Sequence, residues 1–201
     1  MKPYLVLENF LEEKYFNSLK GLICSTKHTF PWYWGPYEAP DEWQEKKAVR
    51  LRNDWEKKDG QRREVMFFEN DPLAFFFTHL IYHHDVPVSP HYQLVHGLIE
   101  MICKSEKNTK KFKTLVRCRI NYFQNYRDGI IHEYPMHVDS DFSHPAAILS
   151  LNTCDGYTKL EDGTKIPSVA NQLLVFDAGE KHCSTTTTNA PARFNIIVNY
   201  L

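Results

Sequence analysis

The residue pattern changes abruptly at Lys113, and this change limits the possible folds more than any other feature. After Lys113, short segments rich in β-branched and aromatic residues are separated by turn signals such as Asp155-Gly156 and Asp162-Gly163. The strands predicted there cover residues 115–123, 146–151, 172–176 and 193–200. Several short strands with few helices over about 90 residues are typical of a sandwich, a jelly roll or a small barrel.

Before Lys113 the apolar residues recur mainly at helical spacing. We predict helices over residues 11–23 and 73–82, and a third that begins at Ser89-Pro90 and buries a stripe between Leu94 and Ile102. A short strand is expected at residues 6–7, and the three prolines in residues 30–40 favour a loop.

The two halves together predict an α+β protein with one domain over residues 1–201. Residues 1–113 would form a mainly helical and loop support region packed against a β core at 114–201, because no boundary between them resembles a flexible linker.

Composition excludes several other classes of protein. Of the 201 residues, 42% are hydrophobic and 24% charged, and the net charge is −1, which is the balance of an ordinary globular chain. Such a charge offers no basic field for nucleic acid, and no apolar stretch suggests a membrane span or a secretory signal. The five cysteines are odd in number and widely spread. We therefore expect free thiols in a reducing cytoplasm, with neither nucleic acid nor membrane as a partner.

Two His-x-Asp triplets occur, at residues 83–85 and 137–139. Composition alone would give about one, so the local structure must decide between them. Residues i and i+2 point to the same side of a strand, whereas on a helix they point about 200° apart. The first triplet ends a predicted helix, so we do not expect it to bind metal. The second, His137-Val138-Asp139, precedes a predicted strand.

A second histidine is available for the later triplet. His182 follows the strand predicted at residues 172–176, and Arg193 opens the last strand eleven residues further on. Two neutral imidazoles and one carboxylate on one side of an ion form the arrangement typical of non-haem Fe(II) oxygenases. The pattern predicts His137, Asp139 and His182 as metal ligands.

The order His137-x-Asp139, His182, Arg193 resembles the double-stranded β-helix core of Fe(II)/2-oxoglutarate-dependent oxygenases, particularly prolyl-4-hydroxylase-like members. The segment Ile-Leu-Ser-Leu-Asn at 148–152 is similar to a family strand, as is the strand-then-helix opening at 5–11. The hairpin at 155–163 has one glycine near its start where Gly-Gly is common in the family. The resemblance implies a jelly-roll core at 114–201, with Fe(2+), 2-oxoglutarate and O2 as cofactor and cosubstrates.

Roles for further residues follow from the resemblance. His137, Asp139 and His182 would be the catalytic iron ligands, and Arg193 would bind the far carboxylate of 2-oxoglutarate through its two-point guanidinium fork. Asn195 shares a strand face with Arg193 and could add an amide contact.

The resemblance also implies a cosubstrate contact from the strand before His137, and Asn121 and Tyr122 are the two candidates for it. Tyr122 lies on the more apolar alternate face of its strand, which favours its pointing into the core. Asn121 continues a coherent polar face with Arg117 and Arg119, and this pattern is the argument for the alternative.

The activity implied by the resemblance is oxidative decarboxylation of 2-oxoglutarate to succinate and CO2, coupled to C–H hydroxylation. A peptidyl residue such as proline is the favoured substrate, by analogy with the family alone. The alternatives are a hydroxylase of a free amino acid, small metabolite or nucleobase, and a non-catalytic cupin-like metal-binding module. A cupin would more often supply a third histidine and a glutamate.

Overall fold

The computed structural model describes residues 4–25, 29–36, 64–66, 74–108 and 110–201. Its two helices are α1 (Glu13–Ile23) and α2 (Tyr92–Lys104). The strands are β1 (Leu5–Leu7), β2 (Tyr33–Pro36), β3 (Glu64–Met66), β4 (Phe75–His83), β5 (Val86–Pro87), β6 (Leu115–Gln124), β7 (Ile131–Glu133), β8 (Pro145–Ser150), β9 (Cys154–Leu160), β10 (Lys165–Ser168), β11 (Leu173–Asp177), β12 (His182–Ser184) and β13 (Ala192–Tyr200).

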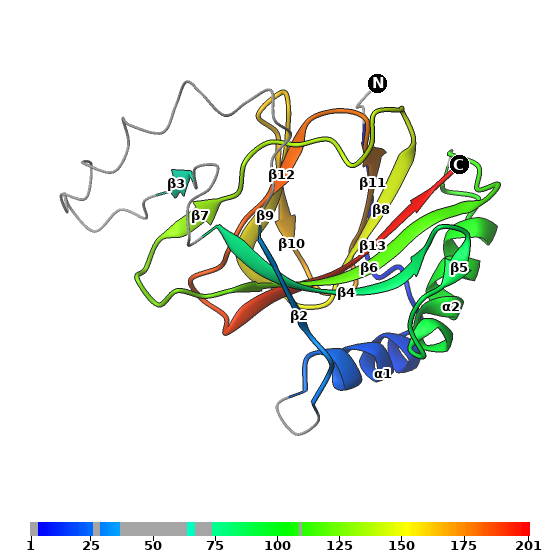
Figure 1. Cartoon of the computed structure of the whole chain (residues 1–201), viewed down its shortest axis with the longest axis horizontal. Helices are drawn as coiled ribbons and strands as arrows, with labels where there is room; N and C mark the ends of the chain where they lie inside the picture. The colour runs from blue at the N-terminus through cyan, green and yellow to red at the C-terminus, as the bar shows by residue number, and fades with distance from the viewer. Residues whose placement is uncertain (1–3, 26–28, 37–63, 67–73, 109) are drawn as a thin grey trace.

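The strands form two facing layers. The larger is an eight-stranded antiparallel sheet in the order β1-β11-β8-β13-β6-β4-β2, with β5 added beside β4. The smaller has the order β10-β9-β12 and lies against the larger sheet (Figure 1), while β3 and β7 form a separate parallel pair. This is the double-stranded β-helix, or jelly-roll, arrangement with two helices, which confirms the predicted α+β fold class.

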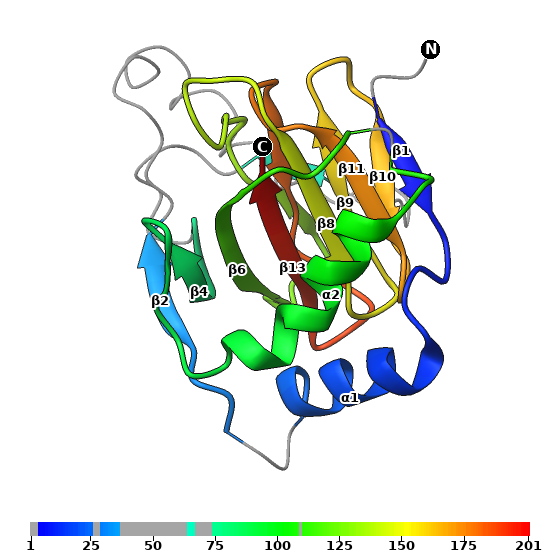
Figure 2. The ribbon, with the colours of Figure 1, turned by 90° about the vertical axis from the view of Figure 1, so that its right-hand side faces the viewer.

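Alternate residues of the large sheet serve two different cores, because successive side chains of a strand point to opposite faces. On the outer face, Ala147 and Leu149 of β8 pack with residues of α1 and α2, which lie across that face in Figure 2. On the inner face, Ala146 and Ile148 pack with Leu160 of the small sheet. The helices therefore cover one side of the large sheet and leave the other side to the small sheet.

The strands predicted after Lys113 are confirmed as β6, β8, β11 and β13, and the predicted strand at residues 6–7 lies in β1. The two helices predicted at residues 11–23 and after Ser89 are also present. Helix α2 begins later than the expected Ser89-Pro90 start: its N-cap is His91, which makes no side-chain capping hydrogen bond, and Ser89 accepts from the backbone N–H of His91 at 3.0 Å in the turn before it.

Two predictions for the first half are wrong. Phe75–His83 is strand β4 and not a helix, because its run of aromatic residues favours an extended chain and pairs with β6. Tyr33–Pro36 is strand β2 and not a loop; a proline is tolerated there because β2 is the outermost strand of its sheet. The start signals expected at Asp71-Pro72 lie outside the described residues.

All five cysteines are free thiols, as their spacing predicts. Among the helices that the structure describes, none is both long and apolar enough to cross a membrane.

Candidate metal centre

His137, Asp139 and His182 meet at one end of the space between the two sheets. The backbone N–H groups of His137 and His182 each donate to the other residue's carbonyl at 2.9 Å, which places the two imidazole rings side by side with centroids 4.5 Å apart. Two residues after His137, the N–H of Asp139 donates to the carbonyl of Ala178 at 3.0 Å. The extended chain from 137 to 139 therefore turns both side chains toward His182, as the sequence predicts.

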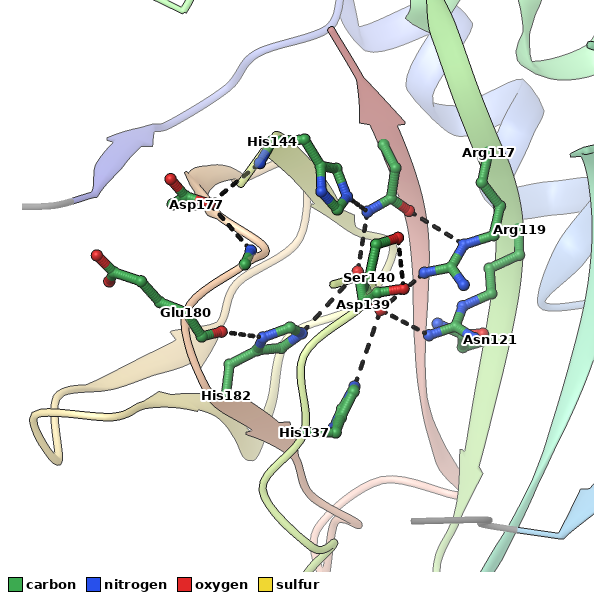
Figure 3. A network of polar contacts seen from close by, with 12 residues as sticks. Arg117, Arg119, Asn121, His137, Asp139, Ser140, His144, Asp177, Glu180 and His182 are labelled. Atoms are coloured by element: carbon green, nitrogen blue, oxygen red, sulfur yellow. Dashed lines mark hydrogen bonds and ion pairs between the residues drawn. The ribbon is translucent and has the colours of Figure 1, made fainter. Parts of the chain in front are cut away.

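The three side chains can share one ion. Their ligand atoms all lie within 4.8 Å of one another. The Nε2 atoms of His137 and His182 lie 3.9 and 4.0 Å from the carboxylate oxygens of Asp139 (Figure 3). Among the described residues, this is the one group of histidine, cysteine and acidic side chains that meets this criterion. Two nitrogens and one oxygen on one side of a shared centre suit an octahedral divalent metal with open positions.

Backbone carbonyls orient both imidazoles. Nδ1 of His182 lies 2.9 Å from the carbonyl of Glu180, and Nδ1 of His137 lies 3.3 Å from the carbonyl of Pro135. A carbonyl only accepts, so each Nδ1 carries the proton and each Nε2 presents its lone pair to the centre.

The protonation states also fit metal binding. Burial, and then the neighbouring His182, lower the pKa of His137 to about 3. Burial likewise lowers the pKa of His182. Burial alone would raise the pKa of Asp139, but the guanidinium groups of Arg119 and Arg117 hold it well below its usual value. At neutral pH the site therefore offers two neutral imidazoles and one carboxylate, as a divalent metal requires.

A polar network holds the carboxylate of Asp139 in place. Nη2 of Arg117 lies 2.7 Å from Oδ1, and the Asn199 amide donates to Oδ2 at 2.9 Å. Asn199 is held in turn by Arg117, whose Nε donates to it at 3.2 Å, and by Nε2 of His144 at 3.0 Å. Each carboxylate oxygen has two lone pairs, so these contacts leave room for a metal and fix the direction in which it would bind.

A cavity of about 270 Å³ opens onto this centre. Four strands of the large sheet, β4, β6, β8 and β13, line it, together with the segment around Asp139 and strand β12. Its described lining residues are Phe76, Arg117, Arg119, Asn121, Phe123, Tyr134, His137, Val138, Asp139, Ile148, His182, Ser184, Asn195 and Ile197.

Arg193 lies beside this cavity. It pairs across the sheet with Phe123, a lining residue, and its guanidinium carbon is 5.5 Å from the centre of that ring. Only 1% of Arg193 is exposed, and Nη2 donates to Thr158 Oγ1 at 2.8 Å. Its Nε and Nη1 have no hydrogen-bond partner, and among the described residues no carboxylate forms an ion pair with it. A buried cation with two unsatisfied donors fits a ligand that brings a carboxylate.

Gly156 makes the space that Arg193 occupies. A Cβ at this position would lie 2.8 Å from Cδ of Arg193 and 2.6 Å from the carbonyl oxygen of Thr186. Any side chain there would therefore displace the arginine, which gives the glycine near the start of this hairpin a physical reason.

Asn195 and Asn121 line the cavity, between Arg193 and the metal centre along their strands. They pair across β13 and β6, and the amide of Asn121 donates to Oδ1 of Asn195 at 3.1 Å. Both are buried. Oδ1 of Asn121 accepts from Thr78 Oγ1 at 3.2 Å, which leaves the amide nitrogen of Asn195 as the side-chain atom of this pair that no described residue engages.

Tyr122, the alternative to Asn121, does not line this cavity. Its ring lies on the other face of β6, packed against Trp32, Phe77 and Phe194 with centroids 5.4, 5.5 and 4.9 Å away. The apolar residues that alternate along β6 do face a core, but it is the core between the large sheet and the helices. The cavity lies on the opposite, polar face of the strand.

The triplet at residues 83–85 does not lie at the end of a helix, as the prediction assumed. His83 ends a strand and not a helix, and His84 and Asp85 form a tight turn with φ of 50° and 62°. The turn, rather than helical spacing, prevents the imidazole of His83 and the carboxylate of Asp85 from sharing an ion.

Asn199 and His144 were missed by the sequence reasoning. Asn199 could have been found, because it continues the alternation of Arg193 and Asn195 along one strand face. His144 carries no such signal; the pairing of β8 and β13 brings it to Asn199.

Comparison with family profiles and with curated protein sequences gives no match. Solved structures do match. A Pseudomonas putida prolyl-4-hydroxylase aligns with a TM-score of 0.56 at 14% identity, over 98% of this chain and 92% of that chain. A Trichoplax adhaerens prolyl hydroxylase, solved with a peptide fragment of a hypoxia inducible factor oxygen degradation domain, gives 0.56 at 14% identity over 99% and 83%. An α-ketoglutarate-dependent epimerase, SnoN from nogalamycin biosynthesis, gives 0.58 at 9% over 99% and 78%.

At these identities the comparisons show the fold. It is the double-stranded β-helix of prolyl-4-hydroxylases and other 2-oxoglutarate and Fe(II) oxygenases, as the resemblance in the sequence implies. The matched proteins include hydroxylases and an epimerase, so what this chain does must be argued from its own site.

Proposed function

We propose that this protein is an Fe(II)- and 2-oxoglutarate-dependent dioxygenase that hydroxylates a C–H bond. The observation that carries the proposal is the pairing of a His-Asp-His centre with a fully buried Arg193 whose Nε and Nη1 have no partner. A metal-binding module without turnover would explain the first feature and would leave the second unexplained.

His137, Asp139 and His182 would hold the iron through Nε2, a carboxylate oxygen and Nε2. With O2, the iron and 2-oxoglutarate would supply oxidative decarboxylation to succinate and CO2, coupled to hydroxylation of the substrate. Burial keeps the two imidazoles neutral, and Asn199 orients the carboxylate by donating to its Oδ2.

Arg193 would bind the far carboxylate of 2-oxoglutarate. Leaving its guanidinium buried without an anion would cost several kcal/mol, and a carboxylate would supply an acceptor that its unsatisfied N–H groups lack. Asn121 and Asn195 would contact the same molecule between its two ends, because they line the cavity between Arg193 and the metal ligands.

Two classes of substrate are open under this proposal. A peptidyl residue such as proline is supported by the prolyl hydroxylases that share the fold, one of them solved with a peptide. A free amino acid or small metabolite is supported by the modest cavity of about 270 Å³.

Succinate formation tests the proposal. Purified protein is supplied with Fe(II), 2-oxoglutarate and O2, with and without proline-containing peptides and small-molecule pools. We expect metal-dependent succinate that increases when a substrate is present, and its loss in His182→Ala. His83→Ala, which replaces a histidine of the rejected triplet, should behave like the parent protein. Metal binding without any succinate, in every pool, would favour the cupin-like alternative.

A further inference from the structure

Asp177, at the end of β11, accepts hydrogen bonds from two segments that are distant in sequence. Its Oδ1 accepts from the backbone N–H of Gly179 at 2.9 Å and from that of His144 at 3.2 Å. The hydroxyl of Ser143 donates to its Oδ2. Figure 3 shows Asp177 beside the segment of His144, outside the group of metal ligands. None of the roles proposed above uses this carboxylate.

The turn that Asp177 opens, residues 177–180, contacts two of the three metal ligands. The carbonyl of Ala178 accepts from the N–H of Asp139 at 3.0 Å. The carbonyl of Glu180 lies 2.9 Å from Nδ1 of His182 and orients its ring (Figure 3). One turn therefore places the backbone of one ligand and the imidazole of another.

Gly179 shows independently that this turn must lie close to the segment before β8. A Cβ at Gly179 would be 2.8 Å from Cα of Ser143 and 3.2 Å from the carbonyl oxygen of Phe142. The N–H of Ala178 donates to the carbonyl of His144 at 2.8 Å across the same contact. Any side chain at Gly179 would push the two segments apart, so the contact requires glycine.

Hydrogen bonds, more than an ion pair, account for the surroundings of Asp177. Burial alone would raise its pKa, but hydrogen bonds from Ser143 and Gly179, with the charge of Lys110, hold the pKa below its ordinary value. Nζ of Lys110 is 3.9 Å from Oδ2 and the lysine side chain is 41% exposed, so this ion pair contributes little. The ionised carboxylate acts only as an acceptor, which suits the three donors around it.

We propose that Asp177 is a positioning residue for the metal centre. Its three hydrogen bonds hold the turn at 177–180 in the place from which two carbonyls fix Asp139 and His182. The role rests on the proposed function, because it needs a metal at this centre. Without the carboxylate, two backbone N–H groups lose their acceptor and the turn relaxes. The metal ligands then lose part of the orientation that binding needs.

Titration with Mn(II) in the absence of O2 tests the role, with urea denaturation of each variant beside it. Asp177→Ala should weaken Mn(II) binding about tenfold or more. Asp162→Ala is the matched control, because Asp162 accepts from the N–H of Thr164 at 2.8 Å in the exposed turn between β9 and β10. It removes the same kind of hydrogen bond and should leave Mn(II) affinity unchanged.

Two milder variants separate the hydrogen bonds from the charge and from folding. Asp177→Asn keeps Oδ1 as an acceptor and can contact Ser143 through its amide, so it should retain most of the affinity although the negative charge is gone. Ser143→Ala removes one of the three hydrogen bonds and leaves the backbone unchanged. It should weaken Mn(II) binding about threefold, which tests the role even if Asp177→Ala does not fold.

A spectroscopic measurement on the metal-free protein follows His182 directly. Nitrogen NMR of the histidine side chains reports which ring nitrogen carries the proton. We expect the proton of His182 on Nδ1 in the parent protein and in Asp177→Asn, and divided between both nitrogens in Asp177→Ala. The signal is recognised by its proximity to the Phe176 ring, whose centre is 4.7 Å away. His137, whose Nδ1 faces the carbonyl of Pro135, is the internal reference and should not change.

The outcomes separate this role from the proposed function. If the parent protein binds Mn(II) and Asp177→Ala binds it equally well, the role is wrong and the proposed function stands. The same holds if Asp177→Asn or Asp162→Ala loses as much affinity as Asp177→Ala, or if the proton of His182 stays on Nδ1 in Asp177→Ala. If the parent protein does not bind Mn(II), the proposed function fails, and the proton position still decides whether Asp177 orients the imidazole.

Discussion

The two faces of strand β6 have different roles: the outer face packs in the hydrophobic core, and the inner face lines the cavity. On the outer face, Cys118 and Ile120 are completely buried among residues of α1, α2 and the neighbouring strands. On the inner face, Arg119 and Asn121 line the cavity beside the metal centre. Adjacent residues of the same strand therefore belong to the hydrophobic core and to the candidate active site.

Residues on the outer face of β6 should contribute mainly to stability, and residues on the inner face mainly to ligand binding. Shortening a side chain on the outer face should lower the free energy of unfolding of the protein, because the helices pack directly on that face. On the inner face, charged and amide side chains take the place of hydrophobic ones in a space shielded from water. These side chains are suited to contact a ligand and contribute little packing. If this division is right, substitutions on the two faces should change different measurements.

The largest effect on stability should come from the outer face. Ile120→Ala should lower the free energy of unfolding by roughly 2–5 kcal/mol, because Ile120 has no exposed surface and its loss leaves a cavity under the helices. Urea denaturation at neutral pH measures this. Mn(II) affinity of the folded variant should match that of the parent protein, and a large loss of affinity would break the division between the faces.

Loss of the carboxylate should have the largest effect on metal binding. Asp139→Asn should weaken Mn(II) binding by more than the roughly 10–100-fold that loss of an outer hydrogen-bond partner typically costs. Equilibrium titration with Mn(II) measures the change. Asp141→Asn is the matched control, since Asp141 is an exposed carboxylate two residues further along. Equal effects in the two variants would mean that Asp139 is not a ligand.

The network behind the carboxylate should give a smaller change in the same measurement. Asn199→Ala removes the donor to Asp139 Oδ2 and the contact with His144, so Mn(II) affinity should fall roughly 10–100-fold. Its effect on the free energy of unfolding should be below that of Ile120→Ala. The opposite ranking would place Asn199 with the packing residues of the outer face.

A separate prediction concerns acid stability without metal. His137 has a pKa lowered from 6.5 to about 3, so between these values the unfolded chain binds more protons than the folded one. Stability should therefore fall as the pH decreases through this window, and further below it as Asp139 takes up a proton. Urea midpoints at several pH values measure the slope, which should be shallower in His137→Gln. An unchanged slope in that variant would contradict a buried, neutral His137.

The sequence predicted the half of the molecule that follows Lys113 well, for a physical reason. Its strands are short, alternate in character and are separated by turn residues, and each of these signals is local. The metal triad could be found in the same way, because His137 and Asp139 need only an extended chain between them. The one long-range element, His182, was reached through its position after a predicted strand and through resemblance to a family.

The parts that were missed depend on contacts distant in sequence. The Phe-rich run of β4 has no clear alternation, so it could not be told from a buried helix until its pairing with β6 was known. The choice between Asn121 and Tyr122 depended on which face of β6 the helices cover. The network of Asn199 and His144 arises from the pairing of β13 with β8, which no local pattern reports.

Binding of 2-oxoglutarate in the absence of O2 is the most direct test of the account. Calorimetric titration should show binding that requires Mn(II) and that weakens about hundredfold in Arg193→Gln, with part of it recovered in Arg193→Lys. Thermal unfolding of both variants checks that the buried position tolerates them. Binding that persists without the metal, or that is the same in Arg193→Gln and the parent protein, would contradict a keto-diacid held between the His-Asp-His centre and the buried guanidinium.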